Sequence, residues 1–109
     1  MIEIGEFVDA QGNSPFGRWV VRLDRHATAR VATALYRMEL GNLSNAKGVG
    51  GGVLEYRIDF GPGYRIYFGR DGEGLIILLG GGTKARQQRD IEDAVTLWRE
   101  YRRSKRQEG

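Results

Sequence analysis

The sequence predicts a single α+β domain over residues 1–109, with a small curved antiparallel sheet, an N-terminal helical hairpin and a C-terminal helix. The expected order is strand, helix, helix, three antiparallel strands, helix. Two observations carry this prediction. Residues 53–60 and 64–68 alternate with period two on either side of a Gly-Pro-Gly loop, which is typical of a β-hairpin. Apolar residues in 15–40 and 83–103 instead recur at helical spacing.

The N-terminal third predicts one strand and two helices. Residues 2–8 alternate weakly and indicate the first strand. Ser14 before Pro15 predicts a helix start, because a hydroxyl caps the free backbone N–H groups and proline fits the first turn. A second helix is expected over about 25–40, closed by Gly41.

The C-terminal half predicts the rest of the sheet and the last helix. Residues 41–52 are expected to be a glycine-rich connection, followed by the hairpin. Residues 75–79 are apolar at every position, which indicates a strand near the sheet centre, and three glycines end it. The last helix is expected from about Thr83 to Arg103, with residues 104–109 frayed and all helices on one side of the sheet.

The expected hairpin sorts its side chains onto two faces. One face is apolar and carries Leu54, Tyr56, Ile58, Phe60, Tyr64, Ile66 and Phe68. The other face is polar and carries Glu55, Arg57, Asp59, Arg65 and Tyr67. If the Gly-Pro-Gly loop sets the register, Asp59 lies opposite Arg65 and Arg57 opposite Tyr67.

Composition restricts the chemistry. The absence of cysteine excludes disulfides and thiolate metal sites, and the single histidine, His26, leaves no pair for a histidine ribonuclease or a histidine metal site. Residues 1–83 are neutral in sum, so residues 84–109 supply the whole net charge of +3. That excess fits either a polyanionic partner or a solvated basic helix. No apolar run reaches membrane length and residues 1–12 lack a secretory signal, so a cytoplasmic protein is expected.

Two other patterns have alternative interpretations. The acidic residues Asp90, Glu92 and Asp93 fit complementation of the helix dipole better than a metal site. Residues 80–84 read Gly-Gly-Gly-Thr-Lys without the full phosphate-loop pattern, so nucleotide hydrolysis is not expected. Glycines before a helix, with Lys84 in its first turn, form either an anion-binding site or a flexible turn.

The remaining candidates are basic or aromatic residues near the sheet: Lys47, Arg57, Arg65, Tyr67, Lys84 and Arg86. Together they suit a phosphate-binding surface. The alternative is a solvated face on which Asp59 pairs with Arg65 and Glu55 with Arg57, each pair contributing about 0.2–1 kcal/mol.

Several segments also carry a family resemblance. They are Gly41-Asn42-Leu43 leading to Lys47, Gly52-Val53-Leu54-Glu55-Tyr56-Arg57-Ile58, Gly61-Pro62-Gly63-Tyr64-Arg65-Ile66-Tyr67-Phe68, and Leu78-Leu79-Gly80-Gly81-Gly82-Thr83-Lys84 with Gln87 and Asp90-Ile91. In these the chain resembles the RelE/ParE toxin superfamily of bacterial toxin–antitoxin modules, in particular its phage-derived HigB-like "addiction module killer" branch. The resemblance covers about four-fifths of the chain and implies the same order of elements.

The resemblance implies ribosome-dependent mRNA cleavage without a metal or other cofactor, by attack of a ribose 2′-hydroxyl on the adjacent phosphate. The implied partners are the ribosome, mRNA and a cognate antitoxin, often with a helix-turn-helix. Arg65 is expected to stabilise the transition state, and Lys47, Arg57 and Lys84 to bind phosphate or relay protons. Tyr67 would position a base or act in acid–base chemistry. Glu55 would act as a base or as an orienting group. The RNA-binding candidates are Glu55, Arg86 and Arg89.

Two departures leave alternatives open. Some relatives place a catalytic tyrosine or histidine near the start of the last helix or at the chain end, where this chain has Gln87, Gln88, Arg89 and Asp90 near that helix start. The superfamily also contains non-enzymatic inhibitors of DNA gyrase. A gyrase inhibitor and an inactive nucleic-acid-binding relic are therefore the competing interpretations.

Overall fold

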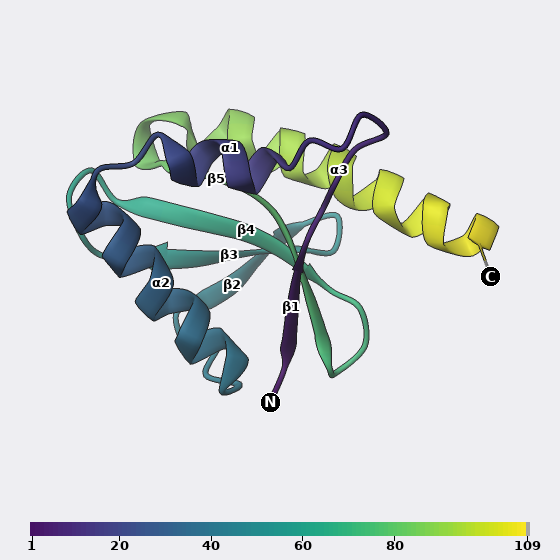
Figure 1. The fold of residues 1–109 in the computed structure, drawn as a ribbon, viewed down its shortest axis with the longest axis horizontal. Helices are drawn as coiled ribbons and strands as arrows, with labels where there is room; N and C mark the ends of the chain where they lie inside the picture. Colours follow the sequence, from purple (N-terminus) through teal and green to yellow (C-terminus); the bar gives the residue numbers. More distant parts are fainter. Residues whose placement is uncertain (109) are drawn as a thin grey trace.

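A computed structural model describes residues 1–108 and confirms the α+β class. Figure 1 shows five strands in one open sheet, ordered β1-β5-β4-β3-β2, with three helices around it. The strands are β1 (Glu3–Glu6), β2 (Ala46–Gly50), β3 (Val53–Ile58), β4 (Tyr64–Arg70) and β5 (Leu75–Thr83). The helices are α1 (Pro15–Val21), α2 (Arg25–Glu39) and α3 (Gln87–Glu108), and a 3-10 turn, η1 (Lys84–Arg86), leads into α3.

The helical hairpin begins as its sequence predicts. The Ser14 hydroxyl accepts a hydrogen bond from the Gly17 N–H, and Pro15 occupies the first helical position of α1. The Asp24 carboxylate accepts one from the Ala27 N–H and starts α2 immediately afterwards. Each cap satisfies a backbone donor that the helix itself leaves unpaired.

The glycine-rich connection expected over residues 41–52 is wrong, because it contains the edge strand β2. β2 pairs with β3 through a tight turn at Gly51 and Gly52, whose φ angles are +62° and +85°. Two consecutive positive φ values suit a hairpin turn, and glycine adopts them without strain. β2 lacks an alternating apolar pattern because three of its five positions are exposed.

The sheet is mixed rather than purely antiparallel. β1 runs parallel to β5, from the pair Glu3–Leu75 to the pair Glu6–Leu78, while the other neighbouring strands pair antiparallel. β5 is therefore an interior strand over this stretch, as its continuous apolar sequence predicts.

The helices cover both faces of the sheet, so the expectation that they lie on one side is wrong. Helices α1 and α2 cover the face of Tyr56, Ile66 and Phe68, using Phe16, Trp19, Val31, Ala34 and Met38. Helix α3 covers the opposite face, where Ala94 and Trp98 pack with Phe7, Val53, Tyr67, Ile77 and Leu79. The polar face predicted for the hairpin is thus partly roofed by a helix, which explains why some of its residues are buried.

Glycines in the central strands make room for the two indoles. A Cβ on Gly69 would lie 2.5 Å from the Trp98 ring, and a Cβ on Gly81 would overlap the Trp19 ring from the other face. Trp19 and Trp98 are only 7% and 5% exposed. The glycines at 80–82 therefore belong to β5 and do not end it.

Helix α3 starts later and ends later than the sequence predicts. It begins at Gln87 and continues to Glu108, so residues 104–108, which the sequence assigns to a tail beyond the helix, are helical, while residue 109 lies outside the described chain. The last turns are anchored: the Tyr101 hydroxyl donates to Asp71 Oδ2 at 2.7 Å, and Lys105 forms an ion pair with the same oxygen. These hydrogen bonds lower the pKa of Asp71, with Lys105 the larger cause.

We predict that Gly81→Ala destabilises the protein by about 1–3 kcal/mol, because the added methyl group overpacks the contact with Trp19. Gly80→Ala is the matched control in the same strand, since a Cβ there meets nothing within 4 Å. Urea unfolding of both variants measures the difference. Equal midpoints for the two variants would contradict the close packing of Trp19 on β5.

Candidate functional site

The candidate residues occupy two rows that cross the sheet on its α3 side. In one row Lys47 of β2 pairs with Glu55 of β3, Glu55 with Tyr67 of β4, and Tyr67 with Gly80 of β5. In the next row Arg57 of β3 lies opposite Arg65 of β4, which pairs with Gly82 of β5. Directly paired residues point to the same face, so the rows bring the predicted basic residues together.

The predicted register of the hairpin is wrong by two residues. Arg57 lies opposite Arg65, not Tyr67, and the pairing ends at Ile58 and Tyr64. The connection therefore spans residues 59–63, and it is held by hydrogen bonds from the Phe60 N–H to the Ile58 carbonyl and from the Gly63 N–H to the Phe60 carbonyl. A loop longer than Gly-Pro-Gly shifts the register, but an even shift keeps each side chain on its predicted face.

A buried polar network lies at the centre of this face. Glu55 is fully buried and Arg65 is 5% exposed, with 3.7 Å between Arg65 Nε and Glu55 Oε1. Glu55 Oε2 accepts hydrogen bonds from the Tyr67 hydroxyl at 3.1 Å and from Gln87 Nε2 at 2.8 Å. Arg65 Nη1 also donates to the Gly63 carbonyl at 2.6 Å. The network joins β3, β4 and the start of α3.

The network corrects the expected ion pairs. The observed ion pair joins Arg65 to Glu55. The interpretation of a solvated face instead expects Arg65 to pair with Asp59 and Glu55 with Arg57, and both of these pairings are wrong. Tyr67 is fully buried, and burial, followed by the neighbouring Glu55 carboxylate, raises the pKa of its hydroxyl far above the usual range. A phenol held neutral in this way is a hydrogen-bond donor to Glu55 at every physiological pH.

Lys47 and Arg57 form the accessible part of the site. Both are exposed, and both line a shallow hollow of about 390 Å³ together with Ser44, Asn45, Ala46 and Asp59. Among the residues that the structure describes, the ion pairs are Arg65–Glu55 and Lys105–Asp71, so neither Lys47 nor Arg57 has a carboxylate partner. The hollow therefore presents two positive charges on adjacent strands, with the exposed Asp59 carboxylate in the same hollow but in no ion pair with either.

The other candidates surround the start of α3. Lys84 and Arg86 are exposed on η1, and Arg89 is exposed on the first turn of α3. Arg86 also lines a groove of about 470 Å³ between α1 and α3, over the end of β5. Lys84 adjoins the hairpin loop, since a Cβ on Gly63 would lie 3.6 Å from the Lys84 Cβ.

The anion-binding turn considered for Gly80–Gly82 is not formed. These glycines are strand residues, and the Asp90 carboxylate packs directly against Gly82, leaving no space for a side chain there. Asp90 Oδ2 is buried without a hydrogen-bond partner, and burial raises the pKa of this carboxyl.

Metal ligands do not cluster in the described chain. Within residues 1–108, no group of three or more His, Asp or Glu side chains lies close enough to hold a metal ion. His26 is exposed at the start of α2. Of the helices in residues 1–108, none combines the length and apolarity needed to cross a membrane.

Sequence reasoning did not identify how Gln87 contributes to the site. The residue is part of the family resemblance, but its contact with Glu55 spans 32 positions in the chain. No local periodicity reports such a contact. The available signal in the sequence was the polar Gln87 itself, near the start of the last helix. That Gln87 faces the buried Glu55 carboxylate is visible only in the folded chain.

We predict that Glu55→Gln destabilises the fold by about 3–5 kcal/mol, because it leaves the buried Arg65 guanidinium without its counter-charge. Tyr67→Phe keeps both charges and removes one hydroxyl, so about 0.5–1.5 kcal/mol is expected. Chemical denaturation measures both free energies of unfolding. A Glu55→Gln variant as stable as Tyr67→Phe would show that the ion pair is dispensable.

We also predict a pH-dependent effect of Asp90→Asn. Because the folded-state pKa of Asp90 is raised above its usual value of 3.8, the native state retains this proton more strongly than the unfolded state. The stabilisation is complete below that value and is lost as pH rises through the raised pKa. The stability of Asp90→Asn relative to the native chain should therefore increase with pH over that window, as measured by unfolding at several pH values. An unchanged difference would contradict the burial of the carboxylate.

Comparison with known proteins places the chain beside a bacterial relative. No protein-family model matches the sequence. A protein of Haemophilus influenzae, described as an uncharacterized protein, is 38% identical over 86 residues, covering 78% of this chain and 87% of the relative. Identity of this level over most of both proteins shows common descent. The chain therefore belongs to the same family as this Haemophilus influenzae protein.

Proposed function

We propose that the protein is the toxin of a type II toxin–antitoxin module and acts in the cytoplasm as a metal-free, ribosome-dependent mRNA endoribonuclease. The proposal joins the resemblance to the HigB-like branch of the RelE/ParE superfamily with the site geometry. The order of elements also suits a RelE-like fold, with one strand added at the edge by β2.

The observation that carries the proposal is the hollow formed by Lys47 and Arg57. Two exposed cations without carboxylate partners project from neighbouring strands of a rigid sheet. Such groups bind a phosphodiester, and they stabilise the negative charge that develops on phosphorus-bound oxygens during cleavage. Strands hold these side chains more firmly than a loop would, which favours a defined transition-state geometry.

The proposed reaction needs no external cofactor. The 2′-oxygen bonds to the adjacent phosphorus while the bond from phosphorus to the 5′-oxygen breaks, leaving a 2′,3′-cyclic phosphate and a 5′-hydroxyl. The 2′-hydroxyl proton must be accepted, and the Lys47 ammonium in the same hollow supplies the proton that the departing 5′-oxygen takes. Asp59 is the carboxylate that lines the hollow, so we assign it the proton-accepting role in place of the buried Glu55.

The buried network supplies positioning in this proposal. The family resemblance gives Arg65 direct stabilisation of the transition state, but Arg65 is 5% exposed and paired with Glu55. We therefore assign direct phosphate contact to Lys47 and Arg57. Arg65, Tyr67 and Glu55 fix the strands that carry them, while Lys84, Arg86 and Arg89 extend the basic surface toward the ribosome or an antitoxin.

Induced expression in a bacterial cell, followed by mapping of RNA ends, tests the proposal. The native chain should arrest growth and cut translated messages, whereas Arg57→Ala should lower cleavage by about 100-fold, because it removes one stabilising donor. Arg25→Ala is the matched control, since it removes an exposed arginine from the start of α2. Equal cleavage by both variants would exclude the hollow as the reactive site.

A gyrase inhibitor is the second candidate, and exposed apolar residues on the helical hairpin favour it. Val21, Tyr36 and Leu40 are 81%, 58% and 56% exposed, and the last two lie one turn apart on the same side of α2 and its C-cap. Such residues suit contact with another protein. Growth arrest with intact messages, together with inhibition of supercoiling by the purified chain, would support this candidate over the ribonuclease.

A further inference from the structure

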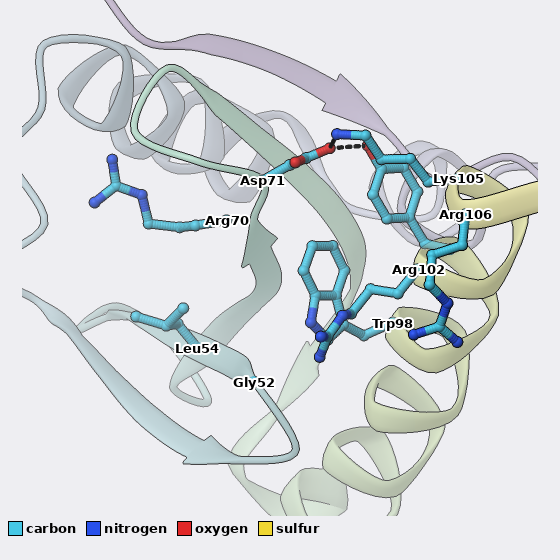
Figure 2. Close-up of a pocket in the computed structure, with 9 residues that line it drawn as sticks. Gly52, Leu54, Arg70, Asp71, Trp98, Arg102, Lys105 and Arg106 are labelled. Atoms are coloured by element: carbon cyan, nitrogen blue, oxygen red, sulfur yellow. Dashed lines mark hydrogen bonds and ion pairs between the residues drawn. The ribbon is translucent and has the colours of Figure 1, made fainter. Parts of the chain in front are cut away.

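The C-terminal half of α3 forms one wall of a basic groove, here termed the distal groove. Figure 2 shows Arg70 and Leu54 on one side and Arg102 and Arg106 on the other, with the Trp98 indole between them. The groove has a volume of about 410 Å³. Its α3 wall lies at the other end of the helix from the Glu55 network, because Lys105 follows Gln87 by 18 residues, or about 27 Å along the helix.

The positive charges of the distal groove continue into a second hollow. This neighbour of about 200 Å³ shares Trp98, Arg102 and Arg106 with the groove and adds Arg99. Arg102 and Arg106 are one turn apart, about 6 Å along α3. The guanidinium groups therefore follow a line rather than surround a point, which suits a polymer with repeated negative charges better than a single small anion.

The distal groove offers donors and almost no acceptors. Asp71 provides its one side-chain carboxylate among the lining residues, and that carboxylate already accepts from Tyr101 and pairs with Lys105. An extended peptide backbone presents N–H groups that would find no acceptor there. The phosphate groups of a nucleic-acid backbone present acceptors only, and guanidinium groups bind phosphate oxygens in a two-pronged geometry.

We infer that the distal groove binds the phosphate backbone of single-stranded RNA, without sequence preference, as a second contact separate from Lys47 and Arg57. The choice of RNA as the nucleic acid rests on the proposed function. Arg102 and Arg106 make the phosphate contacts, and Arg99 in the adjoining hollow extends them along α3. The groove holds the strand and takes no part in cleavage.

Binding of a fluorescent single-stranded oligoribonucleotide by the purified chain, measured between 50 and 200 mM salt, tests the inference. Arg102→Gln with Arg106→Gln removes two contacts and should reduce the slope of log affinity against log salt by about 1.4, so the loss of affinity over this range becomes about sevenfold smaller. Arg18→Gln with Arg25→Gln is the control of equal charge on α1 and α2. Arg99→Gln tests the adjoining hollow and should reduce the slope by about 0.7.

Three results would overturn the inference. The slope of the Arg102 and Arg106 variant equals that of the control pair; Arg99→Gln leaves the slope unchanged; or a poly-glutamate peptide binds the groove while the oligoribonucleotide does not. The assay measures binding to free RNA, so it is independent of cleavage. If messages stay intact in cells while the salt slope of the purified chain still depends on Arg102 and Arg106, the proposed ribonuclease activity is rejected. RNA binding by the distal groove is then retained.

Discussion

The ion pair between Glu55 and Arg65 is the constraint on which the rest of the structure depends. Both side chains are withdrawn from water at the centre of the sheet, where an unpaired charge is far more costly than at the surface. The pair fixes β3 against β4, and Gln87 ties the beginning of α3 to the same carboxylate. The start of α3 is therefore tied to this pair, while Ala94 and Trp98 pack the middle of the helix on the same face of the sheet.

The network also divides the polar face of the sheet into a buried structural part and an accessible basic part. Residues under the start of α3 are buried and hold the sheet, while residues toward β2 remain open. Lys47 and Arg57 are exposed, Lys47 on the edge strand β2 and Arg57 near the end of the neighbouring strand β3. Lys47 and Arg57 near the sheet edge are supported by the buried Glu55–Arg65 pair, which lies one strand further in. The arrangement combines accessible positive charge with a rigid support.

Much of the fold could be predicted from local patterns. Ser14 and Pro15 start α1 as capping chemistry requires, and the alternation in residues 53–68 assigns every side chain of the hairpin to its correct face. The errors arise where long-range packing decides. Gly81 and Gly82 resemble a terminator in sequence, but they remain in β5 because Trp19 and Asp90 occupy the space that side chains would need. The contact of Gln87 with Glu55 is equally invisible to local patterns, since it exists only after the chain has folded.

The attachment of α3 to the β4–β5 turn affects how the chain end moves. A helix of 22 residues that packed only through its first half would fluctuate along the remainder, since isolated helical turns are marginal in water. Tyr101 and Lys105, about four and five turns beyond Gln87, instead fasten the helix to Asp71. Amide hydrogens before this fastening should exchange with solvent only when the domain opens as a whole, whereas those beyond it exchange by local unwinding of the last turn.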